Sequence, residues 1–291
     1  MTLRRDDTIS AVVTHRPITR IAYSVAALRN TATEYAIHGM AKKKNPQPNI
    51  LSKDDPNLLE GVKRLDRAQK TFGWMLIGYG LLTQIIALLN EPLHPVAGLP
   101  FIGVGLFCLG WGDPALLATA ATLLALSIVP TVNPRLSLLG PDPIVTMTGS
   151  GGLEIFALIA AKVLLAYYSL SQFLQFRLLY GTERAVSDEP NLAIIPEMVP
   201  NRTNLYARWA RSTAILGGVI ALIAVGFLIS DPLAVGTRVM AETSGALGAM
   251  ALGLGFGAAF APTDERPAAL IGMGAGLAGY AVAGAVLLLI V

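Results

Sequence analysis

Charged residues, aromatic residues and cysteines are all scarce in this sequence. Only 14% of its 291 residues carry a charge and 7% are aromatic, whereas roughly 25% of residues are charged in an ordinary soluble domain. The single cysteine, Cys108, has no second cysteine with which to form a disulfide, which excludes a disulfide-stapled secreted module. With 53% hydrophobic residues and a mean hydropathy of +0.57, the chain is also unlike a disordered or collagen-like sequence. This composition indicates a protein that lies in a lipid bilayer.

Residue types that carry enzyme chemistry are scarce too. There are three histidines, His15, His38 and His94, and none lies inside an apolar run, where the axial ligands of a b-type haem would lie. The sequence contains no His/Cys/carboxylate cluster with metal-ligand spacing and no Gly-x-Ser-x-Gly nucleophile motif. We therefore predict neither a metal site nor a cofactor, and the sequence favours a protein that is not an enzyme.

Long apolar runs make up most of the last three quarters of the chain. Each is close to the length of about 20 residues that a helix needs to cross roughly 30 Å of hydrocarbon. We predict an all-α integral membrane protein, a polytopic bundle of about seven transmembrane helices, with spans at 72–90, 96–112, 114–132, 152–176, 213–230, 237–260 and 267–291. The second and third spans are joined by Gly112-Asp113-Pro114, so a re-entrant hairpin is the alternative for this pair.

Residues 1–70 differ from the rest because they are polar and basic, with thirteen Lys and Arg against seven Asp and Glu. We predict that they form a cytoplasmic segment with amphipathic helices, separate from the bundle at 71–291. Apolar residues recur at helical spacing over 18–40, and Asp55-Pro56 is typical of the start of a second helix. Because the segment lacks interleaved aromatic residues, we expect no nucleic-acid partner. Anionic lipid headgroups are the expected contacts of its basic residues Lys42, Lys43, Lys44, Lys63, Arg64, Arg67 and Lys70.

The Lys and Arg residues are unevenly distributed between the two sides of this predicted bundle. Nineteen of the 22 lie in the N-terminal segment, in the 177–212 loop or at the short turn that contains Arg266. The connections on the opposite side hold little more than Arg135 and Arg238. By the positive-inside rule, the N-terminus and the 177–212 loop are cytoplasmic and the C-terminus lies outside. The sequence thus predicts a multi-pass protein of a bacterial-type inner (plasma) membrane.

Small residues recur at a spacing of four in the last two apolar runs. Gly253 and Gly257 form one such step, and Gly272 and Gly276 form another. In lipid, where no hydrophobic force draws helices together, such glycines let two backbones approach closely. Because the two pairs lie at similar distances from the polar turn at 263–266, we expect them to face each other.

One ionisable residue, Lys162, lies near the middle of an apolar run. A charge at the centre of a bilayer costs about 3 kcal/mol or more, so such a residue needs a partner. Glu154, Glu242 and Gln84 fall in the same predicted outer half of the membrane, and we expect Lys162 to pair with one of the two glutamates. Three interpretations of Lys162 follow: a structural ion pair that locks the bundle, a side chain whose stem snorkels past lipid, or a site for a substrate, an ion or a proton.

The functional hypotheses follow from this organisation, because no catalytic constellation is present. The favoured hypothesis is a non-catalytic integral subunit or scaffold of a larger membrane complex, which docks other membrane subunits through the 18–40 helix and the 177–212 loop. The first alternative is a small-solute or ion transporter with a polar site around Lys162. The second is a lipid-modifying membrane enzyme. Co-purification with other chains in a fixed ratio would indicate a subunit, whereas solute flux by the isolated chain would indicate a transporter.

Overall fold

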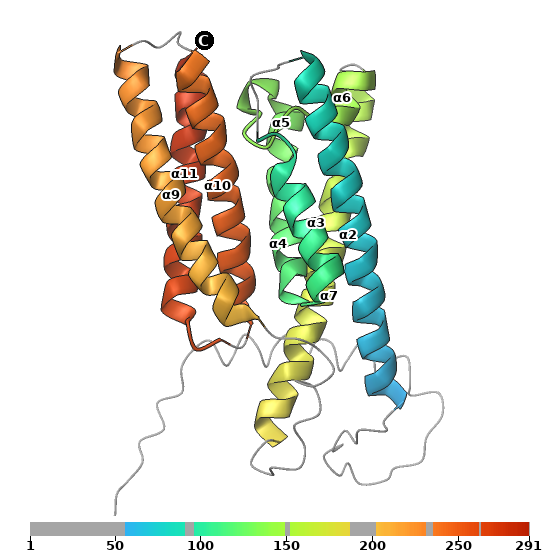
Figure 1. The fold of residues 1–291 in the computed structure, drawn as a ribbon. Coiled ribbons are helices and arrows are strands. Elements are labelled where there is room, and N and C mark those ends of the chain that lie inside the picture. Colours follow the sequence, from blue (N-terminus) through green and yellow to red (C-terminus); the bar gives the residue numbers. More distant parts are fainter. Residues whose placement is uncertain are drawn as a thin grey trace, which may run out of the picture. The chain divides into compact units, whose positions relative to one another are not determined.

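The computed structural model describes residues 56–90, 96–148, 152–186, 202–230, 235–261 and 263–290, and most of them are helical. The elements are α2 (Pro56–Asn90), α3 (Leu99–Trp111), α4 (Ala115–Leu126), α5 (Ile128–Val132), η1 (Pro134–Leu136), α6 (Pro143–Thr148), α7 (Gly152–Val186), α9 (Thr203–Ser230), α10 (Val235–Phe260) and α11 (Arg266–Leu289). These described ranges contain no strand. In Figure 1, α9, α10 and α11 pack together, and α2, α3, α4 and α7 form a neighbouring group. The helix predicted over 18–40 lies outside the described residues.

Six stretches of these helices are long and apolar enough to cross a membrane. They are Glu60–Leu89, Ala115–Val132, Gly152–Arg177, Thr203–Ser230, Val235–Phe260 and Arg266–Leu289. This all-helical arrangement agrees with a multi-pass membrane protein, but the count within the described residues is six and not seven. The predicted span at 96–112 instead forms α3, whose 13 residues are only about 20 Å long.

Helix α3 is short because the chain turns at Gly98, directly before its first residue. Gly98, with φ at +73°, starts the helix, and its N–H donates a hydrogen bond to the carbonyl of Leu139 at 3.1 Å. A Cβ at this position would lie 2.1 Å from the carbonyl oxygen of Gly80 on α2, so only glycine fits. Leu138 and Leu139 are buried. The segment that follows α5 thus packs at the N-terminal end of α3, where a longer helix would otherwise continue.

The third predicted span consists of two helices, α4 and α5, separated at Ser127. Pro130 lacks the N–H that would bond to the carbonyl of Leu126, and its ring crowds that carbonyl, so the regular ladder is interrupted there. The Ser127 hydroxyl donates to the Leu124 carbonyl at 2.7 Å in this interrupted region. The break therefore divides the third predicted span into two helices that meet at Ser127.

Glycines set the closest approaches between helices, but in pairs other than those predicted. A Cβ on Gly276 would lie 2.7 Å from the carbonyl oxygen of Gly248, so α10 and α11 touch backbone to backbone there. Gly272 faces Ala210 on α9, while Gly253 and Gly257 face Thr119 and Ala115 on α4. The expected facing of the 253/257 pair with the 272/276 pair is therefore wrong, because α10 presents those two glycines to α4. Through them, α10 connects the α9–α11 group to the α2–α7 group.

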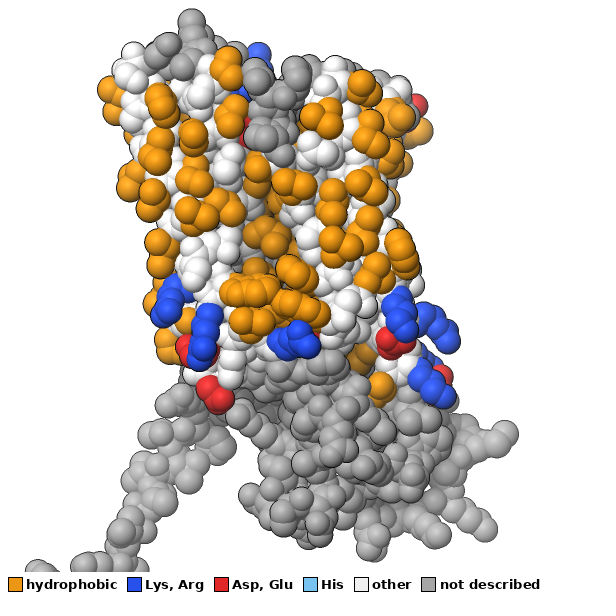
Figure 2. All heavy atoms as spheres, viewed as in Figure 1, with side chains coloured by type: hydrophobic (Ala, Val, Ile, Leu, Met, Phe, Trp, Pro, Cys, Tyr) orange, Lys and Arg blue, Asp and Glu red, His pale blue; other side chains and the backbone are white. Residues whose placement is uncertain are grey.

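Basic side chains gather at one end of the described bundle, which we call the basic end (Figure 2). It holds the exposed residues Lys63, Arg64, Arg67, Lys70, Arg202, Arg208, Arg211 and Arg266. Helix α2 continues through the charged stretch 60–70 without a break, and α7 continues past Arg177 to Val186. In Figure 1 both helices extend beyond α3 and α4 at this end. The predicted boundary at 70/71 therefore falls inside one continuous helix.

Candidate functional site

Lys162 on α7 lies at the centre of a buried polar cluster. Its ammonium group donates to Asp142 Oδ2 at 2.5 Å, to the Ser127 carbonyl at 2.8 Å and to Thr131 Oγ1 at 2.8 Å. The hydroxyl oxygen of Tyr79 lies 3.1 Å away as a fourth acceptor. The side chains of Lys162 and Asp142 are 5% and 1% exposed. Because an ammonium group has three donors, the cluster supplies all the acceptors that this one needs.

Asp142 is placed by the start of α6. Its Oδ1 accepts the backbone N–H groups of Ile144 at 3.0 Å and Val145 at 3.4 Å, which is how an N-cap residue satisfies the first turn of a helix. Pro143 follows it at the first helical position, where the missing N–H does no harm. The Oδ2 atom of Asp142 accepts hydrogen bonds from the Thr131 hydroxyl and from the Lys162 ammonium group. One carboxylate therefore connects α5, α6 and α7.

The other two acceptors come from the break in the third span and from α2. The Ser127 carbonyl lies at the junction of α4 and α5, and it accepts from the ammonium group from the side. Tyr79 packs edge-on against Phe101 with ring centroids 4.9 Å apart, which fixes its hydroxyl beside Lys162. The ammonium group also lies 5.3 Å from the centre of the Tyr79 ring. A complete set of hydrogen bonds is what makes an ion pair tolerable in an apolar interior.

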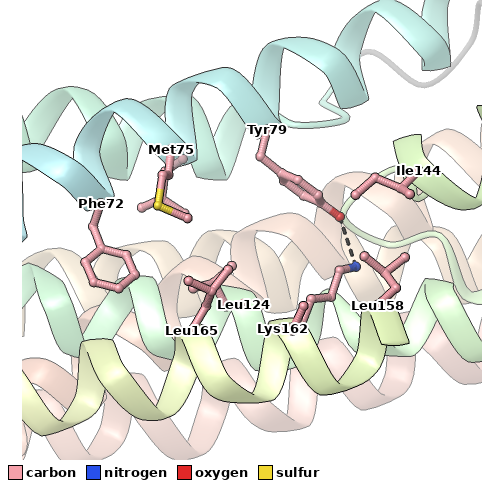
Figure 3. Close-up of a pocket in the computed structure, with 10 residues that line it drawn as sticks. Phe72, Met75, Tyr79, Leu124, Ile144, Leu158, Lys162 and Leu165 are labelled. Atoms are coloured by element: carbon pink, nitrogen blue, oxygen red, sulfur yellow. Dashed lines mark hydrogen bonds between the residues drawn. The ribbon is translucent and has the colours of Figure 1, made fainter. Parts of the chain in front are cut away.

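A cavity of about 150 Å³ lies beside this cluster, between α2 and α7 (Figure 3). Its walls are almost entirely apolar, and Lys162 lies at one end. The lining residues are Phe72, Met75, Leu76, Tyr79, Leu124, Ile144, Leu158, Ala161, Lys162 and Leu165. Because these walls offer almost no polar partner, the cavity suits an apolar occupant better than a polar one.

Of the four residues predicted for the polar site, only Lys162 belongs to the buried cluster. Glu154 is exposed at the start of α7. Glu242 is buried on α10 and accepts from Arg238 Nε at 2.8 Å, one helical turn away on the same helix. Gln84 lies half-buried on α2, beside Gly98. The expected pairing of Lys162 with Glu154 or Glu242 is replaced by a pairing with Asp142, because the segment after α5 folds back between the helices.

The sequence pattern around Lys162 did not identify Asp142 as its partner, although the sequence around Asp142 indicates a helix start there. It is the only acidic residue in the 133–152 connection, and it directly precedes a proline, as an N-cap residue often does. That pattern predicts a short helix in the connection. It does not predict that the connection enters the bundle.

The face of α7 that carries Lys162 packs inward along its length. Ser169, seven residues further on, donates to the Leu117 carbonyl of α4 at 2.7 Å, and Gln172 is also buried. The opposite face exposes large side chains, including Leu164 and Tyr167. Lys162 therefore belongs to a polar stripe that faces other helices and not lipid.

A second buried carboxylate, Asp113, lies near the basic end, in the turn between α3 and α4. Its Oδ1 accepts the Ala115 N–H at 2.9 Å and its Oδ2 accepts the Arg202 N–H at 2.6 Å, so it joins the starts of α4 and α9. The Arg202 guanidinium lies over the Trp111 ring, with its Cζ 4.8 Å from the ring centroid. Burial raises the pKa of Asp113 from 3.8 to about 6. Because the folded-state pKa is the higher one, this group contributes stability at low pH that is lost as the pH rises through 6.

The basic residues predicted to contact lipid headgroups are described only in part. Lys63, Arg64, Arg67 and Lys70 are exposed on α2, with Arg64 bound to Glu60 at 2.6 Å and Lys70 to Asp66 at 2.8 Å. Lys42, Lys43 and Lys44 lie outside the described residues. Across the described ranges, no group of three or more His, Cys, Asp or Glu side chains is arranged to hold a metal ion.

Comparison with known proteins identifies no relative. No protein family matches the sequence, and neither a curated protein nor a solved structure shows significant similarity to it. The function is therefore argued from the contacts of this chain alone.

Proposed function

We propose that the chain is a non-catalytic scaffold subunit of a larger membrane complex. The observation that carries this proposal is the continuity of α2, whose apolar stretch continues without a break into a charged stretch at the basic end. Leu65 of this extension is buried in the core, whereas Lys63 and Arg67, one helical turn apart, are exposed. A docking surface on a rigid helix loses little conformational freedom when a partner binds. Other membrane subunits are the partners that such a surface suits.

The contacts of Lys162 support the same reading. The Asp142 carboxylate neutralises the charge of its ammonium group. Four oxygen atoms of the chain, one of them from Asp142, accept its hydrogen bonds. A site that carries a solute must offer groups that the solute can satisfy, and this cluster has already satisfied its own. The polar cluster therefore suits a role in holding the outer connection to the bundle.

We infer that the basic end lies on the cytoplasmic side of a bacterial-type plasma membrane. There, anionic headgroups contact whichever of Lys63, Arg64, Arg67 and Lys70 the partner leaves uncovered. Cysteine at Met147, which is 71% exposed on α6, should then react with an impermeant maleimide on intact cells, while cysteine at Lys63 should not. The native Cys108 is buried and provides a low background. Labelling of the Lys63 position without permeabilisation would reverse the assigned orientation.

The scaffold proposal predicts a partner whose binding depends on the α2 extension. We expect the full chain, purified from its native membrane in mild detergent, to carry one or more other chains in a fixed ratio. Reversing two exposed charges, Lys63→Glu with Arg67→Glu, should release that partner, because the reversed pair would repel a surface complementary to the native one. The measurement is the stoichiometry of the purified complex.

The matched control is Arg135→Glu, which reverses an exposed charge at the opposite end of the bundle and should leave the stoichiometry unchanged. If the two-charge variant retains its partner, the α2 extension is not the docking surface. If the chain is monodisperse alone and moves a solute across liposomes, it is a transporter instead. The buried Lys162–Asp142 pair within the membrane-spanning region is the one observation that favours this alternative.

A further inference from the structure

The cavity beside Lys162 is closed at both ends along the axes of α2 and α7, and it is open on one side, between the two helices. At one end the rings of Phe72 and Tyr168 stack with centroids 5.8 Å apart, and at the other the Lys162 cluster fills the space. Between these ends, α2 supplies one wall and α7 the other (Figure 3). Met75 and Ile144, on the rim, are 39% and 44% exposed. An occupant therefore enters sideways between two membrane-spanning helices.

Charge complementarity defines what the cavity can hold. The ammonium group of Lys162 is neutralised by Asp142, and its donors are used within the cluster. The cavity thus presents no unmatched charge, and its remaining lining is apolar. A charged or strongly polar ligand would lose its hydration there without compensation. An uncharged hydrocarbon segment loses nothing of this kind, and cavities of about 150 Å³ with apolar walls do accept small hydrocarbons.

We propose that this cavity is a lateral binding site for the hydrocarbon chain of a membrane lipid. Met75 and Ala161 belong to helical stretches that are long and apolar enough to cross a membrane, and in a bilayer the medium beside the opening is then hydrocarbon. A chain seated there fills the void, lies against Tyr79 and Leu158 and covers the Lys162 cluster from the side. The site is independent of the scaffold proposal, since it involves neither the basic end nor a protein partner.

The test is photolabelling of the full chain in phosphatidylcholine vesicles whose acyl chains carry a diazirine. We expect Met75 to be labelled well above Leu222, which is 74% exposed on α9 and outside the cavity. Ala161 lines the cavity and is exposed, so Ala161→Phe places a ring in the opening. Labelling of Met75 should fall about tenfold, the lower end of the discrimination that a steric mismatch in an apolar pocket produces. The matched control, Val163→Phe on the exposed face of α7, should leave it unchanged.

A second variant tests the proposal in the opposite direction. Leu165→Ala enlarges the cavity, so labelling of Met75 should rise, and this result decides the matter if Ala161→Phe does not fold. Equal labelling of Met75 and Leu222 in all variants would show ordinary contact with surrounding lipid and would overturn the proposal. A photo-crosslink from Met75 to another protein chain in native membranes would also overturn it, by placing a partner helix in the opening.

Discussion

Replacing Lys162 with Met should lower the free energy of unfolding by about 3–5 kcal/mol, the usual loss when one partner of a buried ion pair is removed. The Asp142 carboxylate, 1% exposed, would keep its bonds to Thr131 and to the start of α6 but would lose its counter-charge. The expected effect is large because nothing else in the described cluster carries a positive charge. Denaturant unfolding in detergent micelles measures it.

The double variant Lys162→Met/Asp142→Asn should recover most of this loss. Asn can still accept the Ile144 N–H through its side-chain oxygen, and no charge is then left in the interior. We expect a coupling energy of about 2 kcal/mol or more between the two positions. Glu242→Gln serves as the control, because Glu242 is bound by Arg238, and its effect should add to that of Lys162→Met. Strict additivity for Lys162 and Asp142 would contradict the pairing.

Replacing Gly276 with Leu should destabilise the bundle by about 3 kcal/mol or more. Even a Cβ there would lie 2.7 Å from both the Gly248 carbonyl oxygen and the Leu252 nitrogen, so α10 and α11 must separate. Overpacking typically costs about 1–3 kcal/mol, and backbone atoms cannot move aside as a side chain can. The shift in thermal unfolding temperature in detergent measures the loss.

The matched controls are Gly274→Leu on the same helix and Gly226→Leu on α9. A Cβ at either position meets nothing within 4 Å, so neither variant should be destabilised. The better helix propensity of Leu should instead stabilise each by up to about 0.8 kcal/mol. If all three variants have the same thermal unfolding temperature, close backbone approach does not stabilise this pair of helices. If only Gly276→Leu is destabilised, the contact assigned to α10 and α11 is supported.

The sequence by itself determined most of the membrane-spanning elements and the position of Lys162. Hydropathy over windows of about 20 residues depends only on local composition, and six such stretches are present in the described helices. The start of α2 at Pro56 follows from a local signal as well, since proline suits the first position of a helix. Burial of the Lys162 face was also predictable, because residues spaced along one stripe of a helix share its environment.

Only the tertiary structure decided which residues meet. Asp142 reaches Lys162 because the connection after α5 folds back between the helices, and no periodicity in the sequence encodes that path. The same holds for the glycines: their spacing predicts a close contact, but the rotation of α10 about its axis decides that Gly248 meets Gly276 while Gly253 and Gly257 meet α4. That rotation is set by the packing of all neighbouring helices at once, and a local pattern of small residues holds no information about it.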